Sequence, residues 1–364
     1  TMLILVMLLS ALAAEQTPPA FFECLRLIKI MAITFLLRLL LDIRLAWALL
    51  LALAATVGLQ AALGAVQFAL AAGSSGLSEL DTTADETARR ASGTLGHPNF
   101  LAPYLLLFVP GFLAIGIGSR DRLLQLAALA VGLVGALAIL LTQSRAPAAA
   151  LIAASAGLAL TLTLRGYIRP RLLIGGAIGV TVAGMVALAP LAERIYDRLT
   201  GDLSESISFR ADYNEAALAM WGTAPLLGVG PNHFVPNLED YAPLLAGINE
   251  TLEEARKEAN SRAQAPVHNV YLLLLSETGA LGFAAFLLFL GSLLRVFWAA
   301  GRSIRGDPFA LFFTGVSWGF AGLLVQQITD YSLWWDHMMN LVAVLAALAV
   351  FTAARAAPAR GEAP

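Results

Sequence analysis

Long apolar runs alternate with short polar connections along most of the chain. A helix that rises about 1.5 Å per residue needs roughly 20 apolar residues to cross the hydrocarbon core of a bilayer. Many of the runs approach that length, so the pattern predicts an all-α, polytopic transmembrane protein. About nine spans are expected, near Met2–Ala14, Leu45–Ala72, Phe100–Gly118, Leu123–Leu141, Pro147–Leu164, Leu172–Pro190, Val270–Leu294, Phe309–Ile328 and His337–Phe351.

The N-terminal region is the hardest part of this pattern to interpret. Met2–Ala14 has no charged region before it and no small-residue cleavage site after it, so we interpret it as the end of a spanning helix. Phe21–Leu41 is apolar but carries Arg26, Lys29 and Arg38. It is therefore either an interfacial amphipathic helix or a tilted span.

Composition supports a membrane protein and excludes several other classes. The chain is 59% hydrophobic and only 13% charged, with a mean hydropathy of +0.76, whereas soluble domains carry roughly 25% charged residues. The net charge of −2 gives no reason to expect nucleic acid as a partner. Cys24 is the one cysteine of the sequence, so no internal disulfide can form.

The charges are distributed unevenly over the connections between spans. By the positive-inside rule, the connections that collect arginines face the cytoplasm. The opposite face then receives the turn at Ser144-Arg145 and a long acidic loop. We expect N-terminal transmembrane helices over 1–190, a long extracytoplasmic loop over 191–269, and C-terminal helices with a short cytoplasmic tail over 270–364.

The long loop is the one stretch that resembles a soluble segment. Loops of more than about 15 residues are uncommon unless they are functional or disordered. Ser208–Trp221 and Asn249–Ser261 are predicted helices, Ser208 being a plausible N-cap, and Leu226–Asn232 is a predicted turn.

His268 stands where the long loop re-enters the membrane, in the sequence His268-Asn269-Val270-Tyr271. An imidazole in that place can accept a proton from a hydroxyl group. Glu277 follows about two helical turns later. The alternative is that His268 merely precedes a helix that Asn269 caps.

Two arginines are candidates for binding an anion. Arg145 lies on the outer face, against the general trend of arginines, and a guanidinium suits the geometry of phosphate. Arg210 lies at the start of a loop helix. Each has a simpler interpretation: Arg145 as a snorkelling side chain, and Arg210 as part of a solvated helix face.

The remaining polar and aromatic motifs predict a turn and a membrane interface, and they do not predict a metal site. Gly93–Phe100 is a predicted tight turn that places His97 and Asn99 at the outer surface. The four histidines are dispersed, so no metal site and no cofactor are expected. Trp334-Trp335-Asp336 is similar to a signature of oligosaccharyltransferases, but we interpret these aromatic residues as an interfacial belt.

Taken together, five motifs resemble the bacterial O-antigen ligase and O-antigen polymerase-like superfamily, in their order and spacing from about Leu45 onward. They are Gly96-His97-Pro98-Asn99-Phe100-Leu101-Ala102, Thr142-Gln143-Ser144-Arg145, Phe209-Arg210 through Trp221, Gly228-Val229-Gly230-Pro231-Asn232-His233-Phe234 and His268-Asn269-Val270-Tyr271.

The resemblance implies a lipid-dependent glycosyltransferase of the bacterial inner membrane, with its active site on the periplasmic face. Such an enzyme moves a glycan from a polyprenyl (undecaprenyl) pyrophosphate carrier to a hydroxyl of lipid A core, a protein or the growing glycan, without a metal. By resemblance, His268 would be the base or would position the acceptor, and Arg145 and Arg210 would hold the pyrophosphate. Supporting residues would be His97, Asn99, Ser144, Asn269, Tyr271 and Glu277.

This sequence departs from the family in two respects, and other functions stay open. Members commonly have more spans, so the chain is either truncated at its N-terminus or divergent, and Ala146 stands where a glycine is usual. A polymerase or a protein O-oligosaccharyltransferase is the alternative within the superfamily. A flippase for lipid-linked sugars would need polar groups deep within the spans, and a binding scaffold would not depend on His268.

Overall fold

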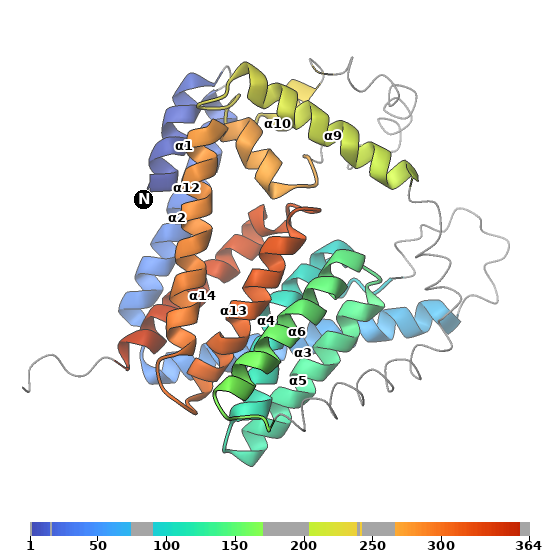
Figure 1. Cartoon of the computed structure of the whole chain (residues 1–364), viewed down its shortest axis with the longest axis vertical. Coiled ribbons are helices and arrows are strands. Elements are labelled where there is room, and N and C mark those ends of the chain that lie inside the picture. Colours follow the sequence, from blue (N-terminus) through green and yellow to red (C-terminus); the bar gives the residue numbers. More distant parts are fainter. Residues whose placement is uncertain are drawn as a thin grey trace, which may run out of the picture. The chain divides into compact units, whose positions relative to one another are not determined.

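The structure, a computed structural model, describes residues 2–14, 17–73, 90–169, 204–238, 241 and 266–356 (Figure 1). Every regular element in these ranges is helical, which confirms the predicted all-α fold for the described part of the chain. The elements are α1 (Met2–Ala13), α2 (Thr17–Leu40), α3 (Ile43–Gly73), α4 (Pro98–Gly118), α5 (Arg122–Leu141), α6 (Arg145–Leu164), α9 (Ser204–Thr223), α10 (Phe234–Asn237), α12 (Val270–Gly301), α13 (Pro308–Gln326), the 3-10 helix η5 (Ser332–Trp334) and α14 (Asp336–Ala354).

Seven of the described helices are long and apolar enough to cross a membrane, namely α3, α4, α5, α6, α12, α13 and α14. They correspond to seven of the predicted spans. The predicted span Met2–Ala14 forms α1, which is apolar but shorter, and Leu172–Pro190 lies outside the described residues. Phe21–Leu41 is helical in α2, which is not among the seven. The multi-pass architecture is confirmed, and the count of nine stays a prediction.

The predictions for the long loop have mixed outcomes. The helix predicted over Ser208–Trp221 is present as α9, and the predicted turn over Leu226–Asn232 is also present. Ser208 lies inside α9 and is not its N-cap, so that prediction is wrong. The helix predicted over Asn249–Ser261 lies outside the described residues.

The chain divides into two compact units. The first comprises Thr1–Leu36, Asp202–Leu293 and Gln327–Val344, and the second comprises Leu37–Gly201, Leu294–Gln326 and Leu345–Pro364. The chain therefore passes from one unit to the other within α2, α12 and α14. Each unit is described by itself.

The second unit is a bundle in which α4 and α13 pack against each other and against their neighbours α3, α5 and α6 (Figure 1). Pro110 in α4 has no N–H and leaves the carbonyl of Leu106 without a helical donor. Gly319 of α13 lies against that carbonyl, where an added Cβ would be 2.6 Å from the Leu106 oxygen. Small residues allow helix backbones to approach this closely in membrane proteins.

Arginines tie three connections together at one end of the second unit. Arg165, after α6, donates to the carbonyl of Gly301 at 2.6 Å, and Arg305 donates to the carbonyl of Arg165 at 2.8 Å. Arg355, after α14, pairs with Asp307 at 3.2 Å. Three of the arginine-bearing segments that the positive-inside rule assigns to one face therefore contact one another at one end of this unit.

The first unit contains a helix that is broken. Gly279 in α12 has φ +64° and ψ −170°, which no helix contains. A continuous helix would bond the amides of Ala280 and Leu281 to the carbonyls of Ser276 and Glu277. These four groups need other partners, because an unpaired backbone group is costly inside a membrane.

Pro225–Gly230, which we name the crossing segment, supplies all four partners from the long loop. Its carbonyls accept from the two amides and its amides donate to the two carbonyls. The hydrogen bonds run from Ala280 N to Pro225 O (2.9 Å), Leu281 N to Leu226 O (3.2 Å), Val229 N to Ser276 O (3.0 Å) and Gly230 N to Glu277 O (2.9 Å). The loop is thus joined to α12 by backbone pairing.

Two glycines make this close approach possible. Gly279 would place a Cβ onto the backbone of Leu226, and Gly228, with φ +71°, would place one onto the backbone of Glu277. The hydroxyl of Ser10, in α1, donates to the carbonyl of Leu227 at 2.6 Å and so joins the same contact. The crossing segment therefore connects α1, α12 and the loop helix α9 within one unit.

The aromatic loop before α14 corrects one prediction. Trp334 is only 6% exposed, its ring lies 5.5 Å from that of Phe286, and the guanidinium of Arg26 lies over it at 4.9 Å. A residue of an interfacial belt would face the lipid, so the belt interpretation is wrong for Trp334.

Candidate functional site

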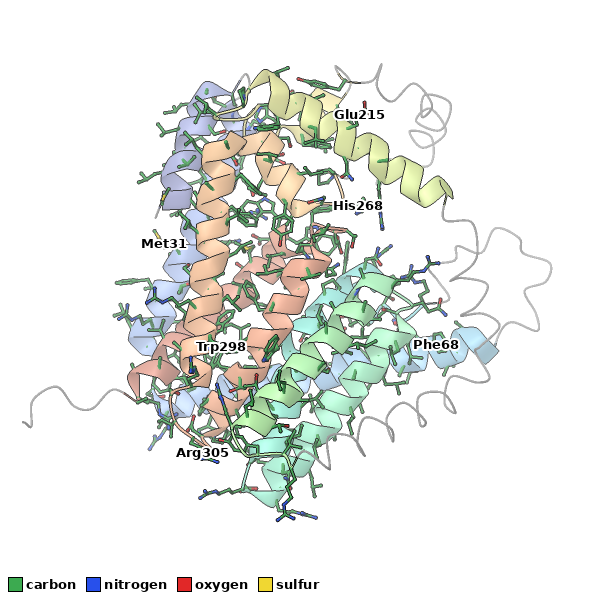
Figure 2. The ribbon with its side chains drawn as sticks, viewed as in Figure 1. Met31, Phe68, Glu215, His268, Trp298 and Arg305 are labelled. Atoms are coloured by element: carbon green, nitrogen blue, oxygen red, sulfur yellow. The ribbon has the colours of Figure 1, made fainter. Side chains whose placement is uncertain are left out.

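The segment that carries His268 is held on both of its sides. Asn269 caps α12, because its side-chain oxygen accepts from the amides of Tyr271 and Leu272 at 3.0 and 3.2 Å. This confirms the predicted cap. The amide of Val270 donates to the carbonyl of Asp330 at 3.0 Å. His268 is therefore placed by a helix start and by the connection before α14 (Figure 2).

His268 is half-buried, and its imidazole contacts the first member of a row of aromatic rings. The ring of Tyr331 lies edge-on at 5.5 Å between centroids, Trp335 lies at the same distance from Tyr331, and His337 at the same distance from Trp335. Burial raises the pKa of the Tyr331 phenol above its ordinary value of 10. Tyr331 is therefore a neutral neighbour of His268 at physiological pH, and it orients the imidazole by contact rather than by charge.

Asp330, which no sequence motif marks, lies in the same connection before α14 as Tyr331. It is 6% exposed, and its carboxylate accepts from the amide of Tyr331 at 2.7 Å. Gln327 helps to shape the same connection, since its side chain accepts from the amide of Leu333 at 2.9 Å. A buried carboxylate one residue from a ring that contacts His268 belongs to the candidate site.

Glu277 lies further along α12, at the crossing segment. It is 4% exposed, and its carboxylate accepts from the amide of Phe234, the first residue of α10, at 3.0 Å. The side chain thus holds the loop that follows the crossing segment. Tyr271, another predicted supporting residue, packs its ring at 6.5 Å from that of Phe286.

Arg210 lies in the first half of α9, with its side chain exposed. One turn later Tyr213 turns inward and is buried, with its ring 6.3 Å from that of Phe234. The helix therefore packs through Tyr213 and leaves Arg210 available to a ligand. Arg210 and His268 both belong to the first unit.

The turn between α5 and α6, in the second unit, carries Arg145. Arg145 is the first residue of α6 and is exposed. Ser144 occupies the N-cap position but makes no capping bond; its hydroxyl donates to the side-chain oxygen of Asn99 at 3.0 Å instead. Gln143 adopts φ +53°, a conformation that costs about 1–3 kcal/mol in a residue other than glycine.

Arg90 holds this turn from the side. It is 9% exposed, and its guanidinium donates to the carbonyl of Thr142 at 2.7 Å and to the hydroxyl of Ser144 at 2.9 Å. A third donation reaches the side chain of Asn99 at 3.4 Å. His97 contributes indirectly, as the N-cap of α4 whose ring accepts from the amide of Asn99 at 3.0 Å.

The structure thus brings some of the predicted residues together. Asn99 and Ser144 are in direct contact, with His97 beside them, and Asn269 and Tyr271 lie next to His268. Arg145 belongs to the other unit than His268 and Arg210. Sequence reasoning missed Arg90, Asp330 and the break at Gly279. No local pattern in the sequence points to Arg90, because its partners lie 52 and 54 positions away.

A metal centre finds no support in the part of the chain that the structure describes. No group of three or more histidine, cysteine, aspartate or glutamate side chains in those ranges could hold an ion. The chemistry that these residues offer is an imidazole in a fixed place and exposed guanidinium groups.

Residues 129–287 match the family model described as O-antigen ligase (Wzy_C), which confirms the resemblance to the O-antigen ligase-like superfamily. A search among curated proteins gave no match. The matched residues include Arg145, Arg210 and His268. With the seven candidate spans, the match supports a multi-pass membrane protein with glycosyltransferase-like function, of ligase or polymerase type, whose partners are a lipid-linked glycan and an acceptor.

Proposed function

We propose that this protein is a membrane glycosyltransferase of the O-antigen ligase type, which transfers a glycan from a polyprenyl pyrophosphate carrier to a hydroxyl group such as one on lipid A core. The observation that carries the proposal is that the segment matched to the O-antigen ligase family contains His268, Arg145 and Arg210. The fixed and half-buried position of His268 at the start of α12 supports its role.

The proposed reaction is a substitution at the anomeric carbon of the donor sugar. The hydroxyl of the acceptor loses its proton to His268 while its oxygen forms a bond to that carbon. The bond between the carbon and the pyrophosphate oxygen breaks, and the carrier leaves as polyprenyl pyrophosphate. His268 therefore acts as a general base, a role that typically contributes about 10²–10⁴-fold to a rate.

Arg145 and Arg210 are proposed to hold the pyrophosphate. Negative charge develops on the leaving group, and guanidinium groups placed around it stabilise that charge with paired hydrogen bonds. Both side chains are exposed, so their donors are accessible to a ligand. In this proposal the two arginines supply the positive charge that a divalent cation supplies in other phosphate-cleaving sites.

The experiment is transfer of the host's own undecaprenyl pyrophosphate-linked glycan in proteoliposomes that contain the full-length protein. His268→Ala is expected to lower kcat by at least about 10²-fold, and Arg145→Ala and Arg210→Ala to raise the KM for the donor. Arg122→Ala, which removes another exposed arginine, is the matched control and should not change the KM. Unchanged transfer by the His268→Ala protein would contradict the mechanism.

A deletion strain distinguishes a ligase from a polymerase. Loss of a ligase leaves polymer that is still linked to the carrier, whereas loss of a polymerase leaves single repeat units. Surface glycan from the deletion strain therefore decides between the ligase that we propose and the polymerase of the same superfamily.

A further inference from the structure

The buried guanidinium of Arg90 joins three separate pieces of the second unit. It contacts the carbonyl of Thr142 at the end of α5, the hydroxyl of Ser144 before α6, and the side chain of Asn99 in α4. The neighbouring amide of Ala91 donates to the carbonyl of Leu141 at 3.2 Å, so the backbone joins the same contact. The turn between α5 and α6 is thus held by Arg90 together with the direct hydrogen bond from Ser144 to Asn99 at the start of α4.

This attachment determines the shape of the turn. Arg90 binds the residues on both sides of Gln143, whose left-handed backbone, with φ +53°, is unfavourable and needs such support. The hydroxyl of Ser144 is turned away from its own helix, where a serine N-cap normally bonds. It bridges Arg90 and Asn99 instead.

Arg145 follows immediately, as the exposed first residue of α6. Any change in the turn moves the start of α6 and with it the guanidinium of Arg145. Arg90 itself is buried, and its guanidinium donates hydrogen bonds to Thr142, Ser144 and Asn99. It is therefore suited to hold Arg145 in place and not to contact the substrate.

We infer that Arg90 is a positioning residue for donor binding, which acts through Thr142 and Ser144 to place Arg145. The inference rests on the proposed function, in which Arg145 binds the pyrophosphate of the donor. A lysine at this position would keep the charge but would lose the planar fork that reaches a carbonyl and a hydroxyl together.

The test is a double-mutant cycle with Arg90→Lys and Arg145→Ala, measured as KM for the donor and kcat in proteoliposomes with the host's lipid-linked glycan. Arg90→Lys is expected to raise the KM about tenfold, with a smaller change in kcat. If it acts through Arg145, the double variant should have the same KM as Arg145→Ala alone. Additive effects on KM would overturn the inference.

Arg165→Lys is the matched control. The guanidinium of Arg165 also binds a carbonyl and a hydroxyl, namely the carbonyl of Gly301 at the end of α12 and the hydroxyl of Thr314 within α13, the latter at 2.9 Å. The donor KM of Arg165→Lys should stay at the wild-type value. A rise as large as that of Arg90→Lys would show a general loss of structure and overturn the inference.

A second variant tests the same inference in case Arg90→Lys folds poorly. Ser144→Ala removes one hydroxyl and is expected to raise the donor KM by about threefold, whereas an unchanged KM would count against the inference. The single variant Arg145→Ala separates a failure of the proposed function from a failure of this inference. If Arg145→Ala binds the donor normally, the proposed function fails. If Arg145→Ala binds the donor poorly but Arg90→Lys binds it normally, only this inference fails.

Discussion

The crossing segment in the first unit and the turn before α6 in the second unit are both held in place by hydrogen bonds to distant residues, but through different groups. Each is an irregular stretch of backbone with residues in left-handed conformations. At the crossing segment, four backbone hydrogen bonds with α12 satisfy the backbone groups that the break at Gly279 leaves unpaired. At the turn, the side chains of Arg90, Asn99 and Ser144 supply the contacts.

This difference determines how each region responds to substitution. Backbone pairing tolerates many side chains but fails where a Cβ blocks the approach, so glycines are its sensitive positions. A side-chain network fails when one partner loses its donor or acceptor, and a similar residue can restore it. Substitutions of Gly228 and Gly279, where a Cβ would overlap backbone, should therefore be severe, and polar substitutions at the turn before α6 should have graded effects.

The largest effect is expected from Gly279→Ala. The added Cβ would overlap the backbone of Leu226, and φ +64° with ψ −170° is a conformation that alanine does not adopt. We expect a loss of about 3 kcal/mol or more of stability, seen as a loss of monodisperse protein in detergent gel filtration. Gly291→Ala, in the same helix with open space around the glycine, is the control and should leave the yield unchanged.

Glu277→Leu should come next. It removes the buried acceptor for the amide of Phe234 and leaves that donor unpaired, at a cost of about 1–3 kcal/mol. Glu277→Gln keeps an acceptor oxygen and should lose much less. Thermal unfolding in detergent, followed by intrinsic fluorescence, compares the two; equal losses would show that the hydrogen bond to Phe234 is not what Glu277 contributes.

A smaller loss is expected in the second unit from Asn99→Leu, which removes the oxygen that accepts from Ser144 and Arg90. We expect about 1–2 kcal/mol. Asn99→Asp keeps that oxygen and adds a charge beside Arg90, so it should retain the wild-type melting temperature. If aspartate destabilised as much as leucine, the turn would not depend on this acceptor.

The sequence predicts the helices around the two regions but not the contacts that hold the regions themselves. Hydropathy located the spans, and the asparagine before Val270 was recognisable as a helix cap because capping depends on neighbouring residues. Gly279 stands in an apolar run that has the pattern of a single helix, and its partners lie about fifty residues earlier in the chain. Arg90 likewise contacts residues 52 and 54 positions away, in segments with no shared pattern. Contacts of this kind depend on tertiary packing, which local periodicity does not contain.

The smallest effect is expected from the exposed ion pair between Lys29 of α2 and Asp336 of α14, both in the first unit. The ammonium lies 2.6 Å from the carboxylate, but the side chains are 44% and 54% exposed. Exposed pairs contribute about 0–1 kcal/mol, and salt screens them. Lys29→Gln should therefore lower the apparent melting temperature only slightly, and the difference from wild type should vanish in 1 M salt. A loss as large as that of Glu277→Leu, or one that salt does not reduce, would mean that a solvated pair can hold this unit as firmly as the buried contacts at the crossing segment.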